Sequence, residues 1–104
     1  MIAVDTSALI AIVMGEPEGK RCFTALSEAD HLLMSAATMA ETLIVSARRN
    51  RTNEMTKLLA GLNFDVINVT PASARDVARA YDQWGKGVHR AALNFGDCFA
   101  YVIA

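Results

Sequence analysis

The feature that most constrains this chain is the alternation of short apolar runs with longer segments of helical periodicity. The runs Ile2–Asp5 and His31–Ser35 lack the regular polar alternation of a strand with one solvent-facing side, and Phe64–Val69 is rich in β-branched residues. Because helix-length segments separate the runs, the order predicts parallel strands joined by helical crossovers. We therefore expect an α/β fold with a central parallel sheet, in a single domain spanning residues 1–104.

The segments between the strands have apolar residues at helical spacing. We expect helices over Ala8–Met14, Pro17–Ala29, Ala37–Asn50, Thr52–Leu62 and Pro71–Trp84, and a last one that opens at Gly96 and Asp97. Three of them have a predicted core stripe: Cys22, Phe23, Leu26 and Ala29 in the second, Met55, Leu58, Leu59 and Leu62 in the fourth, and Ala74, Val77, Ala78, Tyr81 and Trp84 in the fifth.

Composition excludes several classes of protein. A chain that is 53% hydrophobic and 20% charged is not intrinsically disordered. The longest apolar run, Ala8–Met14, is too short to span a membrane, and no basic residue precedes it as in a secretory signal. Cys22 and Cys98 show no ligand spacing, so we expect two reduced thiols in a cytoplasmic protein. The net charge of −1 means that any nucleic-acid contact must use a local basic patch.

Three acids in apolar surroundings carry the functional signal. Asp5 ends the first predicted strand, Glu41 shares a helix face with apolar residues, and Asp97 stands at the start of the last helix. A charge against a core is unfavourable unless it is paired or bound to a metal. A shared Mg²⁺ or Mn²⁺ ion would explain all three, because these ions prefer oxygen ligands, and it would support hydrolysis of a phosphodiester.

Each acid also has a structural interpretation. Asp5 and Asp97 are both placed where a side chain caps a helix, and Glu41 is placed to pair with Arg48. Asp5 after a first strand also fits an aspartyl phosphotransferase, although such enzymes want a second acid where Ser7 stands. The residues alone leave these alternatives open.

A few polar residues accompany the acids. Ser7 is placed to orient a carboxylate or a water molecule, or simply to cap the first helix. Lys86, His89 and Arg90 come shortly before Asp97, so they are our candidates for holding a phosphate backbone near the acids. Of these, we assign substrate binding to Lys86 and Arg90.

Three motifs in order resemble one family. Ile2–Leu9, Met39–Thr42 and the long stretch Gly85–Tyr101 are similar to PIN-domain ribonucleases, above all to the VapC-type toxins of VapBC toxin–antitoxin pairs. The resemblance implies a PIN-like three-layer sandwich and a Mg²⁺- or Mn²⁺-dependent endoribonuclease. It implies Asp5, Glu41 and Asp97 as the catalytic acids. Asp5 and Asp97 would be metal ligands, Glu41 would bind the ion directly or through water, and Ser7 would stand beside the first acid.

The resemblance also implies an RNA substrate, a homodimer and a cognate antitoxin whose C-terminal segment fills the groove near the acids. Two features depart from the family: Arg90 stands where many members have proline, and the chain stops at Ala104, before a further strand that often carries another acid. This missing C-terminal strand motivates an alternative function, a catalytically impaired PIN-like module that binds antitoxin or RNA without cleaving it.

Overall fold

The sheet is parallel, as the sequence predicts. The computed structural model describes residues 1–91 and 93–104, and in them the strands β1 (Ile2–Ala3), β2 (Leu32–Ser35) and β3 (Asp65–Ile67) lie in the order β1-β2-β3. Ile2 aligns with Leu32, and Met34 aligns with Val66. All carboxyl ends of parallel strands lie at one edge of a sheet, so the segments that follow these strands meet there.

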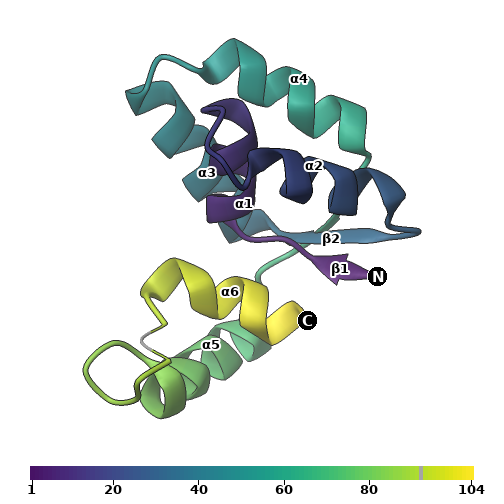
Figure 1. Cartoon of the computed structure of the whole chain (residues 1–104). Helices are drawn as coiled ribbons and strands as arrows, with labels where there is room; N and C mark the ends of the chain where they lie inside the picture. The colour runs from purple at the N-terminus through teal and green to yellow at the C-terminus, as the bar shows by residue number, and fades with distance from the viewer. Residues whose placement is uncertain (92) are drawn as a thin grey trace.

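Helices cover both faces of this sheet (Figure 1). On one side lie α1 (Thr6–Val13), α2 (Gly19–Glu28), α3 (Ala36–Arg48) and α4 (Thr52–Leu62). On the other side lie α5 (Pro71–Trp84) and α6 (Phe95–Ile103), with α6 against the sheet and α5 outside it. The predicted α/β architecture with three layers is therefore confirmed.

Local turns and caps explain why three helices begin or end at other residues than the sequence predicts. The second helix starts at Gly19 rather than Pro17, because Gly19 N–H first closes a turn onto Glu16 C=O at 2.8 Å. The third stops at Arg48 because Asn50 adopts a left-handed conformation with φ of 57°. The last starts at Phe95, because the Asn94 side chain caps it one residue earlier than expected.

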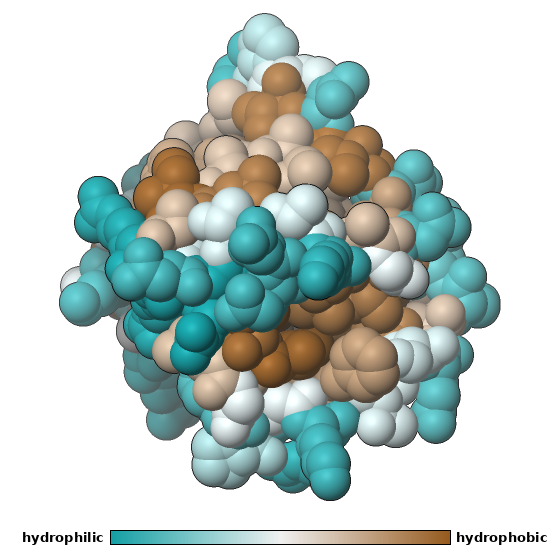
Figure 2. Space-filling model, turned by 90° about the horizontal axis from the view of Figure 1, so that it is seen from above, coloured by the Kyte–Doolittle hydropathy of each residue, from teal (hydrophilic) through white to brown (hydrophobic). Residues whose placement is uncertain are grey.

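The main core lies between the sheet and the first four helices. Its buried members come from the residue after β1, from β2 and from α1, α2 and α4: Val4, Leu9, Ile10, Leu26, Leu32, Met34 and Met55. A second, smaller core joins α5 to α6 through Val77, Ala80 and Cys98. Figure 2 views the first helical layer from above and shows hydrophobic residues reaching the surface in patches bordered by hydrophilic ones.

Two predictions about burial were wrong. Phe23 is 46% exposed although it shares a helix face with buried Leu26. In α5 the buried face centres on Val77 and Ala80 while Tyr81 is 39% exposed, because this helix packs mainly on α6. All of β3, one of the two edge strands, is exposed. No helix in the described part of the chain is long and apolar enough to cross a membrane.

Candidate acidic site at the carboxyl edge of the sheet

Asp5 sits where the chain leaves β1 and enters α1. It is the N-cap residue of that helix, and its Oδ1 accepts a hydrogen bond from Ala8 N–H at 3.2 Å. The same oxygen accepts a bond from the Ser7 hydroxyl at 2.9 Å. The helix-cap interpretation of Asp5 is therefore right, and Ser7 does stand beside the carboxylate. Capping occupies one carboxylate oxygen, so it is compatible with a second role for the side chain.

Glu41 lies on α3 and is half-buried. Its Oε1 accepts a hydrogen bond from the Thr6 hydroxyl at 2.7 Å, and the Thr42 hydroxyl in turn donates to Thr6 Oγ1 at 3.2 Å. Within residues 1–91 and 93–104 no ion pair joins Glu41 to Arg48. The carboxylate is thus held by a neutral hydroxyl rather than by a cation. Sequence reasoning did not identify Thr6 or Thr42.

Asp97 is the third residue of α6 and forms a reciprocal capping box with Asn94. Asn94 Oδ1 accepts from Asp97 N–H at 2.8 Å, and Asp97 Oδ2 accepts from Asn94 N–H at 2.9 Å. Asn94 is a site-forming residue that sequence reasoning missed, and an asparagine three residues before the acid was the available signal. Burial raises the pKa of the neighbouring Cys98 thiol, and the charge of Asp97 raises it further.

Two contacts bring Glu41 to the other acids. Thr6, the residue after Asp5, is hydrogen-bonded to the Glu41 carboxylate. On the α6 side, a Cβ built on Gly96 would lie 2.6 Å from each Glu41 carboxylate oxygen, so the backbone next to Asp97 touches this carboxylate. Glu41 therefore lies between the start of α1 and the start of α6, where Asp5 and Asp97 are found.

The donor types at this edge fit a hard divalent cation. Carboxylate oxygens are the ligands that Mg²⁺ and Mn²⁺ prefer, and none of the three acids takes part in an ion pair within the described residues. By contrast, Asp30 and Asp65 at the amino edge pair with the amino terminus and with His31. The side chains of the described residues nevertheless do not place three potential ligands close enough together to share one ion.

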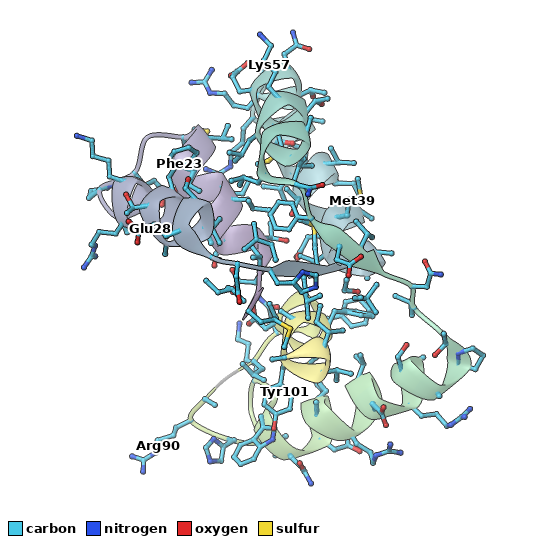
Figure 3. The ribbon with its side chains drawn as sticks, turned by 90° about the vertical axis from the view of Figure 1, so that its right-hand side faces the viewer. Phe23, Glu28, Met39, Lys57, Arg90 and Tyr101 are labelled. Atoms are coloured by element: carbon cyan, nitrogen blue, oxygen red, sulfur yellow. The ribbon has the colours of Figure 1, made fainter. Side chains whose placement is uncertain are left out.

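The two basic candidates lie on the segment between α5 and α6. Lys86 and Arg90 are exposed, and neither forms an ion pair with the three acids in the part of the chain that the structure describes. Arg90 projects outward from the body of the molecule (Figure 3). Their role as phosphate-binding residues stays a prediction.

A cavity of about 630 Å³ lies elsewhere, between the C-terminal ends of α2 and α4. It is lined by Leu26, Leu58 and Leu62 among others, and by the Asp30–Leu32 segment that leads into β2. It therefore opens at the amino edge of the sheet, opposite the three acids.

Comparison with known proteins connects this geometry to a family. Residues 2–104 match the PIN domain family. "VapC ribonuclease Mb0640" of Mycobacterium bovis is 42% identical over 107 residues, covering 99% of this chain and 81% of that protein. "Ribonuclease VapC36" of Mycobacterium tuberculosis is 43% identical over 105 residues, covering 97% and 76%.

"Ribonuclease VapC" of Mycolicibacterium smegmatis is 36% identical over 106 residues, covering 99% of this chain and 82% of that protein. The likeness extends over nearly the whole chain in each case, including the three segments that carry the acids. The chain belongs to the PIN-domain family and is of the VapC type.

Proposed function

We propose that this protein is a metal-dependent endoribonuclease, the toxin of a toxin–antitoxin pair. The relatives of 36–43% identity are named VapC ribonucleases, and the likeness covers nearly all of the chain. The observation that carries the proposal is the position of Glu41, which is hydrogen-bonded to the neighbour of Asp5 and touches the neighbour of Asp97. Three carboxylates from distant parts of the sequence thus approach one edge of the sheet, and no described residue forms an ion pair with them.

Each acid has a separate task in the proposed reaction. Asp5 and Asp97 would hold Mg²⁺ or Mn²⁺, and Glu41 would bind the ion directly or through water. When bound, such an ion activates water and stabilises charge on phosphoryl oxygens. Glu41 orients the water for in-line attack on phosphorus. The attacking water forms the new P–O bond and gives up a proton to solvent as the bond to the 3′-oxygen breaks. The leaving 3′-oxygen takes up a proton, which gives a 5′-phosphate and a 3′-hydroxyl.

Lys86 and Arg90 are proposed to contact the RNA backbone, and Ser7 to hold the Asp5 carboxylate in place. The role of Ser7 is supported by its 2.9 Å hydrogen bond to Asp5 Oδ1. We further propose a cytoplasmic homodimer that is inhibited by a cognate antitoxin. These partners follow from the VapC type of the chain.

One observation favours a second candidate function, a module that binds antitoxin or RNA without cleaving it. Among the described residues no three potential ligands are grouped around one point. Protein that binds RNA yet releases no fragments at any Mg²⁺ or Mn²⁺ concentration would support this candidate over the nuclease.

The direct test replaces Asp5 and Asp97, one at a time, by asparagine. The Asp5→Asn and Asp97→Asn variants keep helix-capping side chains, so the circular dichroism spectrum and melting temperature should change little. Cleavage of end-labelled total bacterial RNA in Mn²⁺ should fall by at least about 100-fold, since outer-shell partners of a metal site alone are worth about 10–100-fold. Parent-like cleavage by both folded variants would show that the proposed site is wrong.

A further inference from the structure

The face of α3 that is turned inward carries hydroxyl groups. Thr38, Thr42 and Ser46 follow one another at four-residue spacing, and each is at most 1% exposed. A buried hydroxyl is unfavourable unless it is hydrogen-bonded. The presence of three such groups on one helix face therefore calls for a physical reason at each position.

The three hydroxyls are used differently. Ser46 bonds within its own helix, to the carbonyl oxygens of Thr42 at 2.8 Å and Leu43 at 3.1 Å. The Thr38 hydroxyl has no partner among the described residues. The Thr42 hydroxyl leaves the helix and reaches Thr6 Oγ1 on α1 at 3.2 Å. Of this stripe, it is Thr42 that connects α3 to the proposed active site.

The direction of the bonds follows from the available protons. A carboxylate accepts hydrogen bonds but donates none, so the 2.7 Å bond between Thr6 and Glu41 uses the single proton of the Thr6 hydroxyl. The Thr6 oxygen must then accept from Thr42. Chained hydroxyls polarise one another, so the first bond strengthens the second.

We propose that Thr42 is a positioning residue that holds the Glu41 carboxylate in its working orientation through the Thr6 hydroxyl. Thr42 and Glu41 are neighbours on α3, and both are hydrogen-bonded to the Thr6 hydroxyl. The buried Thr42 donates to the Thr6 oxygen, and the Glu41 carboxylate accepts the Thr6 proton. The Gly96 backbone limits the carboxylate on the α6 side. The effect of this device on cleavage rests on the proposed nuclease function, whereas its effect on the carboxylate itself does not.

The test compares isosteric and conservative variants of the full chain. Thr42→Val keeps the shape of the side chain and removes the hydroxyl, and Thr42→Ser keeps the hydroxyl and removes the methyl group. In Thr42→Val, the Mn²⁺ concentration that gives half-maximal RNA cleavage should rise about 10-fold, or the cleavage rate should fall about 10-fold. This is the usual effect of removing a residue that orients a metal ligand. Thr42→Ser should stay within about twofold of the parent, since it retains the donor.

Thr38→Val is the matched control. It makes the same substitution on the same helix face one turn earlier, where the hydroxyl has no partner among the described residues, so cleavage and its Mn²⁺ dependence should not change. A Thr42→Val protein with parent-like Mn²⁺ dependence and rate would overturn the proposal, even if it melts at a lower temperature. A Thr42→Ser protein as impaired as Thr42→Val would overturn it as well, because the hydroxyl would then not be the cause.

A second readout is independent of RNA cleavage. The carbon-13 chemical shift of the Glu41 carboxyl group at neutral pH should move in Thr42→Val and stay near the parent value in Thr42→Ser and Thr38→Val. If the parent cleaves no RNA, the nuclease proposal fails while this measurement still decides the positioning role. If Thr42→Val does not fold, Thr6→Val interrupts the same chain of hydroxyls and should move the same signal; an unchanged signal would overturn the proposal.

Discussion

Gly96 shows how a single position without a side chain shapes the acidic site. It lies within α6, where alanine would ordinarily favour the helix by about 0.5–1 kcal/mol. A Cβ at this position would nevertheless lie 2.6 Å from both oxygens of the Glu41 carboxylate. The group in conflict is the end of a flexible side chain, so the substitution should displace the carboxylate rather than unfold the helix.

We therefore expect Gly96→Ala to separate activity from stability. RNA cleavage should fall by about 10-fold, as for loss of a site-orienting contact, while the melting temperature stays level or rises. Gly61→Ala is the control, because Gly61 lies inside α4 with open space around its Cβ position, and it should stabilise the protein without altering cleavage. Cleavage assays and thermal unfolding measure both effects. An active Gly96→Ala protein would show that the Glu41 orientation seen here is not required.

At the scale of elements, sequence patterns located the helices but not their packing faces. The bounds of α4 and α5 agree with prediction, because Thr52 and Pro71 mark their starts and the apolar spacing fills their length. In α5 the sequence did not identify which flank of the apolar stripe would meet α6. In the structure Tyr81 is exposed, whereas Ala80 is buried. The spacing of apolar residues predicts a broad apolar face of the helix, but the position of the neighbouring helix determines which part of that face is buried.

The packing of α1 against α2 gives a prediction at this scale. A Cβ on Gly19, the first residue of α2, would lie 2.5 Å from the backbone oxygen of Ala11 in α1. Since a backbone atom cannot move away as a side chain does, Gly19→Ala should lower the free energy of unfolding by about 1–3 kcal/mol. Urea denaturation measures the change, with Gly61→Ala as the comparison. Stability equal to the parent would mean that the two helices can separate at little cost.

At the scale of the whole molecule, the described residues form two cores of unequal size. The larger one joins β1 and β2 to the first helical layer, and the smaller one has the three buried residues Val77, Ala80 and Cys98. Asp97 belongs to α6, which packs on both the sheet and α5. One of the three acids is thus carried by the layer with the smaller core.

We expect α5 to open more readily than α3. Amides of α5 should exchange with deuterium at least about 10-fold faster than those of α3, since α5 packs mainly on α6 whereas α3 packs on α1, α4, α6 and the sheet. Hydrogen exchange followed by mass spectrometry or NMR measures this difference under native conditions. Equal protection in the two helices would show that both cores unfold as one cooperative unit.

The sequence by itself determined the parallel α/β order, the three acids as candidates and the helix-capping role of Asp5, because strand composition, helical period and capping residues are local signals. Only the tertiary structure decided that Thr6 and Thr42 reach Glu41, that Gly96 touches it and that β3 is exposed. Contacts between residues 35 or more positions apart depend on how layers stack, and no local pattern encodes that distance.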